Sequence, residues 1–181
     1  RAGIARLIEN LKKIKTKKFV LISTIDVYST TADVDEGTVI DKGALAPYGK
    51  HRRELEEFVA NNFDALIVRL PGIYGPGMKK NPLFDLLHES YTYIHHASQL
   101  QFYDLRNIWA DITSALDKKL KLVNFVTEPV TLREIADQVL NTDISTMENG
   151  QPQHYDIRTK HAAEWGNVMP YLYTKEAVLA G

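Results

Sequence analysis

The chain has 181 residues, of which 44% are hydrophobic and 25% charged, the composition of one ordinary globular domain with enough apolar side chains for a core. Its net charge of −1 gives no general attraction to nucleic acid or to a membrane surface, so we expect neither as a partner. No apolar run reaches the roughly 20 residues of a membrane span, and the lack of cysteine excludes disulfides, thiolate catalysis and thiol-bound zinc.

The first half of the sequence alternates between helical and strand patterns. Apolar residues recur at helical spacing from Ile4 to Ile14, and two short apolar runs are rich in β-branched residues. Alternation of apolar strands with helices favours right-handed crossovers and a parallel sheet. In chain order, we expect a helix over 2–15, a strand over 19–24, a loop over 29–45, a helix over 47–61 and a strand over 65–70.

The second half is less regular. Thr131 and Glu134 form a capping-box pattern, which predicts that a helix begins there. The other elements that we expect are a helix over 82–89, strands over 91–96 and 99–105, a helix over 107–120, strands over 121–126 and 153–158, and a last helix over 171–180.

Tyr48 and Arg52 lie four residues apart in a predicted helix, so their side chains share one helix face. A cation beside a phenol favours the phenolate, which a tyrosine with an ordinary pKa of about 10 needs before it can act as an acid/base near neutrality. Ligands gather at the carboxyl ends of parallel strands, so Thr24, Tyr48 and the turn 71–75 are expected to line one crevice. A packing tyrosine beside a solvated arginine is the alternative.

His95 and His96 are the other residues whose chemistry needs a decision. In a strand, neighbouring side chains point to opposite faces, so this pair would be a poor set of metal ligands. We therefore expect no metal site. The lysine-rich segment 12–18 follows a predicted helix, where cations favour the helix dipole and are commonly solvated, so it predicts no nucleic-acid site.

Three segments in fixed order carry a family resemblance: KKFVLISTIDVYS, PYGKHRRELE and ALIVRLPGIYGPG. They resemble the extended short-chain dehydrogenase/reductase family, the NAD-dependent sugar epimerases and dehydratases, whose patterns read FVYiSS..VYG, PYgxSKxxxE and R..nvYGPg. The match is close over residues 4–77. It continues more loosely through FYDLRNIWADI and LVNFVTEPVTLREIA.

The resemblance implies an α/β fold, a Rossmann-like parallel sheet with flanking helices and a small mixed α/β lobe that binds substrate. It assigns residues 1–77 and 107–126 to the Rossmann-like domain, without the N-terminal glycine-rich βαβ units. Residues 78–106 and 127–181 would form the substrate-binding lobe.

The resemblance also implies site roles. Thr24 would polarise a substrate oxygen, Tyr48 would be the acid/base, and Arg52 would hold the nicotinamide ribose and adjust Tyr48. Substrate contacts would come from Thr24, Asp26 and Tyr74, and cofactor contacts from Tyr48, Arg52, Pro71, Gly72 and Ile73.

The sequence departs from the family pattern at several points. Arg52 stands where the family has lysine, which keeps the charge but not the compact ammonium geometry. His51 replaces the usual serine, and Gly72 replaces a substrate-facing asparagine. A glycine-rich loop that would place a pyrophosphate on a helix N-terminus has no counterpart in this sequence. We therefore expect the C-terminal part of a longer protein, which does not retain NAD or NADP by itself.

The leading hypothesis is an NAD- or NADP-dependent epimerase/dehydratase or reductase that acts on a nucleotide-linked sugar or a related carbohydrate. We expect a cytoplasmic protein, and the family implies a homodimer through the helices 2–15 and 47–61. The alternative is a non-catalytic family member, a binding, regulatory or dimerising module in which Arg52 marks lost chemistry.

Overall fold

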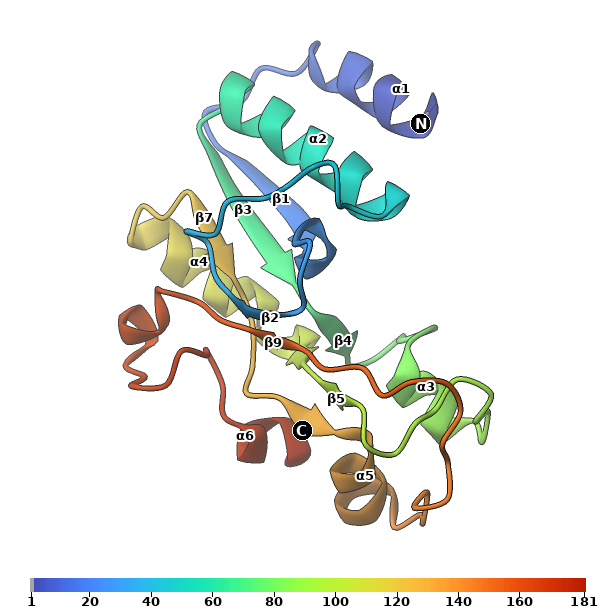
Figure 1. Cartoon of the computed structure of the whole chain (residues 1–181). Helices are drawn as coiled ribbons and strands as arrows, with labels where there is room; N and C mark the ends of the chain where they lie inside the picture. Colours follow the sequence, from blue (N-terminus) through green and yellow to red (C-terminus); the bar gives the residue numbers. More distant parts are fainter. Residues whose placement is uncertain (1) are drawn as a thin grey trace.

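The computed structural model describes residues 2–181, with a parallel sheet at the centre (Figure 1). Strands β1 (Phe19–Thr24), β3 (Ala65–Leu70) and β7 (Leu122–Asn124) lie in the order β1-β3-β7 and pair in parallel. Every side chain of β3 is buried, as in a central strand covered on both faces. The predicted parallel pairing and the bounds of β1 and β3 are confirmed, and β7 is shorter than the predicted strand over 121–126.

Helices cover both faces of this sheet. Helices α1 (Ala2–Leu11) and α2 (Pro47–Asn62) pack on one face, and α4 (Ile108–Asp117) packs on the other. Leu55 and Val59 of α2 are buried against the sheet, as the helical spacing of apolar residues requires. The predicted helices are therefore confirmed, although α1 ends before the lysine-rich segment.

The start of α2 is set by its contact with a short 3-10 turn, η1 (Ile25–Val27), that follows β1. Pro47 occupies the first helical turn, where its missing N–H costs nothing. A Cβ on Gly49 would come within 2.0 Å of the backbone oxygen of Asp26, so only glycine permits this approach. The close packing brings the first turn of α2 to the carboxyl end of β1.

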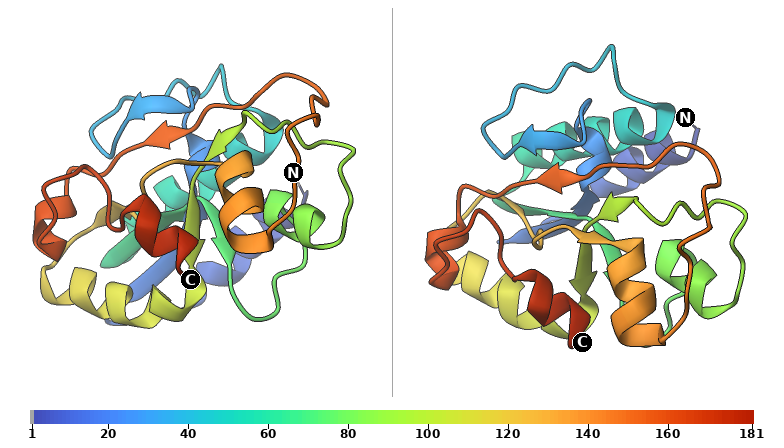
Figure 2. Two further views of the ribbon diagram at one scale, coloured as in Figure 1. Left: turned by 90° about the horizontal axis from the view of Figure 1, so that it is seen from below. Right: turned by 60° about the horizontal axis from the view of Figure 1, so that its bottom comes forward.

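Short strand pairs and helices surround this core. β4 (Gly72–Tyr74) pairs in parallel with β6 (Phe102–Asp104), β2 (Ala32–Val34) in parallel with β9 (Asp156–Ile157), and β5 (Gln99–Leu100) antiparallel with β8 (Val130–Thr131). The helices are α3 (Pro82–Leu87), α5 (Leu132–Ile135), its π-helical continuation η3 (Ala136–Leu140), α6 (Lys175–Leu179) and the 3-10 turns η2 (Leu105–Asn107) and η4 (Ala162–Trp165). Figure 2 shows α6 between α4 and α5.

These short elements confirm some expectations and correct others. The capping box is present, with Thr131 and Glu134 bonded reciprocally at the start of α5. The prediction of a loop over 29–45 is wrong for β2, whose partner β9 lies more than a hundred residues later. The strand expected over 91–96 is also wrong, since this segment forms turns and a single bridge between His95 and Glu148.

A buried ion pair ties α2 to β3. Glu56 of α2 and Arg69 of β3 are 0% and 1% exposed. Arg69 donates from Nε to Glu56 Oε1 over 3.0 Å and from Nη2 to Oε2 over 2.7 Å, a two-bond arrangement. Arg69 Nη1 also donates to the hydroxyl of Tyr28 over 2.8 Å, and the side-chain amide of Asn124 donates to the same hydroxyl. The network joins α2, β3, β7 and the segment after β1.

A second buried carboxylate, that of Asp111, binds the C-terminal segment to helix α4 through hydrogen bonds. Asp111 of α4 accepts hydrogen bonds from the hydroxyls of Tyr103 and Tyr173 and from the indole N–H of Trp165. Burial and the nearby carboxylate raise the pKa of both tyrosines, so they stay neutral donors. Segments that are distant in sequence are thereby held against α4.

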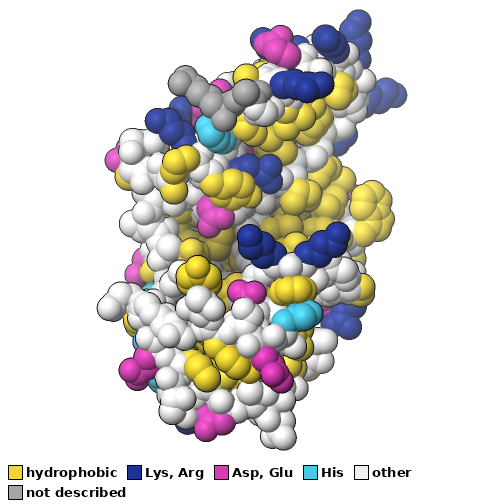
Figure 3. Space-filling model, turned by 90° about the vertical axis from the view of Figure 1, so that its right-hand side faces the viewer, with side chains coloured by type: hydrophobic (Ala, Val, Ile, Leu, Met, Phe, Trp, Pro, Cys, Tyr) yellow, Lys and Arg dark blue, Asp and Glu magenta, His cyan; other side chains and the backbone are white. Residues whose placement is uncertain are grey.

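One edge of the central sheet is open. Within residues 2–181, β1 pairs only with β3, and Ile22 on this strand is 38% exposed. Figure 3 shows hydrophobic side chains over the middle of this side of the molecule, with Lys and Arg side chains among and above them. An apolar surface beside a parallel edge strand therefore remains uncovered in the described part of the chain.

Candidate functional site

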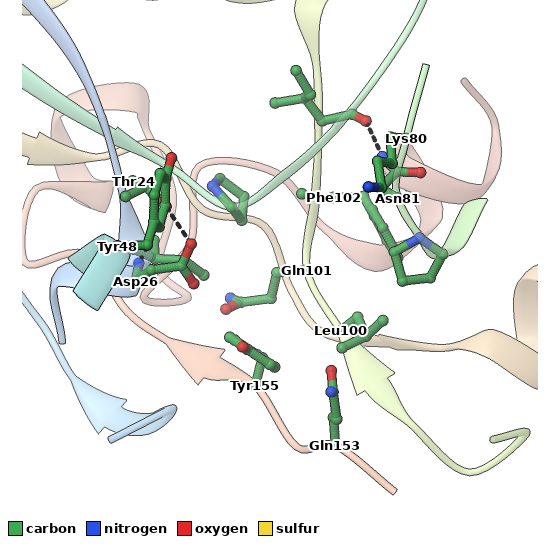
Figure 4. Close-up of a pocket in the computed structure, with 15 residues that line it drawn as sticks. Thr24, Asp26, Tyr48, Lys80, Asn81, Leu100, Gln101, Phe102, Gln153 and Tyr155 are labelled. Atoms are coloured by element: carbon green, nitrogen blue, oxygen red, sulfur yellow. Dashed lines mark hydrogen bonds between the residues drawn. The ribbon is translucent and has the colours of Figure 1, made fainter. Parts of the chain in front are cut away.

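A cavity of about 330 Å³ lies at the carboxyl ends of β1 and β3, where ligands bind in open parallel sheets. The first turn of α2, strand β4 and segments from the second half of the chain close it (Figure 4). Its lining residues are Thr24, Ile25, Asp26, Tyr48, Pro71, Gly72, Ile73, Lys80, Asn81, Pro82, Leu100, Gln101, Phe102, Gln153 and Tyr155.

Thr24 ends β1 and caps the turn η1. Its hydroxyl accepts from the Asp26 N–H over 3.2 Å and donates to Asp26 Oδ2 over 2.9 Å. A hydroxyl has only one proton to donate. Thr24 can therefore donate to a ligand oxygen only after its hydrogen bond to Asp26 is broken. Asp26 thus determines whether the Thr24 hydroxyl is available as a donor.

Tyr48 lies one residue into α2, and its side chain is 56% exposed and lines the cavity with Thr24 and Asp26 (Figure 4). The Arg52 guanidinium carbon lies 5.9 Å from the centre of the Tyr48 ring, within the range of a cation–π contact. Arg52 Nη2 donates to the backbone oxygen of Ile22 over 2.9 Å, which holds the guanidinium beside β1. Arg52 itself is not part of the cavity lining.

The turn after β3 reaches the cavity only in part. Pro71, Gly72 and Ile73 line it, whereas Tyr74 does not. Neighbouring side chains of a strand point to opposite sides, and Tyr74 lines a separate apolar cavity with residues of α3 and η3. The expectation that the whole turn 71–75 lines one crevice is therefore wrong for Tyr74 and Gly75.

Several lining residues were not predicted from the sequence. Among residues 2–181, Lys80 is the only basic residue in the lining and Asp26 the only acidic one, and Figure 4 places them on opposite sides of the cavity. The polar run Lys79–Asn81 after a glycine-rich turn was the available signal for Lys80. Nothing local pointed to Tyr155, which the pairing of β9 with β2 brings to the site.

Not every polar side chain in the lining is available to a ligand. Gln101 is buried, donates to the backbone oxygens of Thr127 and Ile157, and accepts from the Ile157 N–H. Its amide is fully used in holding β9 against β6, so Gln101 builds the wall. Burial and the charge of Asp26 raise the pKa of Tyr155, which therefore stays a neutral phenol at the cavity.

The side chains of His95 and His96 are not oriented as they would be in a strand. Because 91–96 is not a strand, the rings of His95 and His96 do not face opposite sides but stack, with centres 5.2 Å apart. Within the described residues, no three His, Asp or Glu side chains gather as metal ligands would. No helix between residues 2 and 181 has the length and apolar character needed to cross a bilayer.

A parallel sheet flanked by helices, with a cavity at its carboxyl edge, defines an α/β protein of the Rossmann-like class. The family model described as the NAD dependent epimerase/dehydratase family matches residues 2–108, and the chain belongs to this family. A search of curated protein sequences found no significant match.

Solved structures share the fold at low sequence identity. MoeE5 in complex with UDP-glucuronic acid and NAD aligns with a TM-score of 0.70 at 15% identity, over 93% of this chain and 64% of that one. RMD from Pseudomonas aeruginosa with NADPH aligns with 0.69 at 17% identity, over 91% and 65%. UDP-N-acetylglucosamine 4-epimerase from Methanobrevibacter ruminantium with UDP-N-acetylmuramic acid aligns with 0.67 at 15%, over 93% and 62%. The chain thus spans slightly under two thirds of these structures.

Proposed function

We propose that the protein is an NAD- or NADP-dependent epimerase/dehydratase or reductase that acts on a nucleotide-linked sugar or a related carbohydrate. The observation that carries this proposal is that Thr24, Tyr48 and the segment Pro71–Ile73 line the same cavity. One similar solved structure contains UDP-glucuronic acid and NAD, another NADPH and a third UDP-N-acetylmuramic acid, which supports the substrate class and the cofactor.

In this proposal Tyr48 exchanges a proton with a sugar hydroxyl, because its phenol lines the cavity beside a fixed cation. Thr24 orients the same sugar oxygen. It first gives up its bond to Asp26, whose carboxylate then accepts a hydrogen bond from another hydroxyl of the substrate. Lys80, on the opposite side, is suited to an anionic group such as a phosphate.

A bound nicotinamide would supply the acceptor and donor of hydride for this chemistry. The backbone of Pro71, Gly72 and Ile73 would flank its ring, and Arg52 would reach its ribose. The fit is supported by Arg52 Nε, a buried donor that has no hydrogen-bond partner within residues 2–181.

The described residues offer no comparable binding site for the pyrophosphate of the cofactor. Gly72 begins β4, and Gly75 and Gly77 follow it; this segment leads to the six-residue helix α3, not to a long helix that could accept a phosphate at its start. We expect this chain to bind NAD weakly or not at all. Calorimetric titration that gives a micromolar dissociation constant would contradict this part of the proposal.

Substitution of two side chains tests the function. In the natural full-length protein, Tyr48→Phe should abolish turnover of the cognate sugar nucleotide. Arg52→Lys should leave turnover equal or higher, because lysine keeps the charge and has a more compact head. Tyr93→Phe is the matched control, since Tyr93 is exposed and lies outside the cavity lining. Wild-type turnover in Tyr48→Phe would show that Tyr48 is not the acid/base.

One observation favours a second candidate, a non-catalytic binding or regulatory member of the family. The guanidinium of Arg52 is bonded to the Ile22 carbonyl, and the Thr24 proton is bonded to Asp26. Thr24 would have to exchange its bond to Asp26 for one to the substrate before catalysis, and Arg52 is anchored to β1 through Nη2. A sharp loss of activity in Arg52→Lys would mean that the site is rebuilt around the guanidinium.

The remaining expectations are proposals of the same kind. Separate apolar clusters around the sheet and around α3 and α5 support a Rossmann-like domain and a substrate-binding lobe, although Tyr103 and Leu172, assigned to the lobe by the predicted bounds, pack in the cluster around the sheet. Leu7 and Ile14, exposed in and just after α1, support a homodimer through α1 and α2. A cytoplasmic location fits the proposed nucleotide-sugar substrate.

A further inference from the structure

A second cavity of about 290 Å³ adjoins the first. The two cavities share Ile25, Asp26, Tyr48 and Tyr155, so these residues form the partition between them. Both volumes are near the lower end for ligand pockets, roughly 300–1,000 Å³. The second one is far larger than a sugar hydroxyl. Its remaining lining is Tyr28, Ser29, Thr30, Thr31, Ala44, Ala46, Gly49 and Ile157.

Some polar groups of the second cavity are already engaged. The Tyr28 hydroxyl accepts from Arg69, and the Thr31 hydroxyl donates to the backbone oxygen of His154 over 2.6 Å. The hydroxyls of Ser29 and Thr30 make no hydrogen bond within the part of the chain that the structure describes.

The partition also carries hydrogen-bonding groups that the described part of the chain does not use. Within residues 2–181, the hydroxyl of Tyr155 makes no hydrogen bond, and Asp26 accepts from side chains through only one of its two oxygens. Donors and acceptors are thus available on both the partition and the outer wall.

The rest of the wall is small and apolar. Ala44, Ala46 and Gly49 come from the start of α2 and the loop before it, and Ile157 of β9 adds a larger apolar side chain. The short side chains create the space, and the tight contact of Gly49 with η1 keeps α2 in place. The cavity therefore combines a carboxylate, methyl-sized apolar surface and, within residues 2–181, the unbonded hydroxyls of Ser29, Thr30 and Tyr155.

We propose that the second cavity is a substrate subsite that takes the N-acyl group of an amino sugar whose reacting carbon lies beside Tyr48. An amide presents one donor, one acceptor and a methyl group. Asp26 accepts from the amide N–H, the hydroxyls of Ser29 and Thr30 donate to its carbonyl oxygen, and Ala44 packs on the methyl group. The inference rests on the proposed function and narrows its substrate class to N-acylated hexosamines.

The test compares UDP-N-acetylglucosamine with UDP-glucose, which differ only by an acetamido group in place of a hydroxyl. Dissociation constants for this chain are measured by ligand-observed NMR titration. We expect the acetamido sugar to bind about tenfold more tightly, the difference made by a hydrogen bond and a buried methyl group. Ala44→Leu, which fills the cavity, should reduce this ratio to near one.

Two further variants sharpen the test. Thr30→Val keeps the shape and removes a hydroxyl, so it should lower the ratio severalfold. Val39→Leu in the same loop is the control, because Val39 is exposed and lies outside both cavities, and it should leave the ratio unchanged.

The outcomes separate the inference from the proposed function. Equal binding of both sugars to the wild type, or a tenfold preference that survives in Ala44→Leu and Thr30→Val, overturns the subsite and leaves the function standing. Failure of both sugars to bind the wild type overturns the nucleotide-sugar function and the subsite together.

Discussion

Removal of the charge on Glu56 should destabilise the protein more than any comparable change on the same helix. Glu56→Gln keeps the size and shape of the side chain and leaves the Arg69 guanidinium, which is 1% exposed, without its counter-ion. Arg53 Nη1 also donates to Glu56 over 2.9 Å and loses a charged partner. The buried cation then faces an apolar core with only neutral acceptors.

The size of the effect follows from burial. Breaking one partner of a buried ion pair typically costs about 3–5 kcal/mol, and the isosteric amide keeps an acceptor, so we expect about 3 kcal/mol, the lower end of that range. For a chain of this length, 1 kcal/mol shifts the unfolding midpoint by roughly 2–4 °C, so the midpoint should fall by on the order of 10 °C. This is a large part of a typical stability of roughly 5–15 kcal/mol.

Urea and thermal unfolding followed by circular dichroism measure this loss, with Glu57→Gln as the matched control. Glu57 is the next residue of α2 and pairs with Lys42 over 2.7 Å at a solvent-accessible position. Such exposed pairs contribute about 0–1 kcal/mol, so the control should unfold within a few degrees of the wild type. Equal stability of the two variants would refute the reasoning that burial makes the Glu56 pair different.

Three more predictions use the same unfolding assays. Burial alone would raise the pKa of Glu56, but the hydrogen bonds and charge of Arg69 outweigh it and lower the pKa. The ion pair therefore stabilises the fold above about pH 4.3, and this stabilisation is lost as the pH falls through the lowered pKa. Glu56→Gln should consequently lose less stability than the wild type between pH 5 and 3. Gly49→Ala should cost about 1–3 kcal/mol by overpacking, because its Cβ would meet backbone at 2.0 Å, whereas Gly3→Ala, which meets nothing within 4 Å, should not destabilise. Asp111→Asn removes the charged acceptor of three donors and should cost about 1–3 kcal/mol and change the fluorescence of Trp165, which donates to it; unchanged emission and stability would contradict this role.

Much of the central sheet could be predicted from the sequence. The strands over 19–24 and 65–70 match the structure at both ends, because buried parallel strands are short apolar runs bounded by breakers. The helix over 47–61 and the capping box at Thr131 follow local patterns of the same kind. The order of these elements also placed Thr24 and Tyr48 at one edge of the sheet, which the cavity confirms.

The rest depended on contacts between distant segments. The β2–β9 pair joins strands of three and two residues, too short for a periodic pattern, and together with the bonding of the preceding segment to Gln99 it brings Tyr155 to the cavity. Tyr74 lies outside the crevice because neighbouring side chains of a strand point to opposite sides, so its side chain points away from that of Ile73.

The sequence by itself determined the main strands of the central sheet, the helices that cover it and the end of the sheet at which Thr24 and Tyr48 lie, since these follow from local spacing of apolar and polar residues. Only the tertiary structure decided that Asp26 accepts the hydrogen bond of the Thr24 hydroxyl and that Lys80 lies across the cavity from Asp26. It also decided that a second cavity adjoins the first. Hydrogen-bond partners and cavity walls come from segments more than a hundred residues apart, and their meeting depends on packing in three dimensions, which local patterns do not encode.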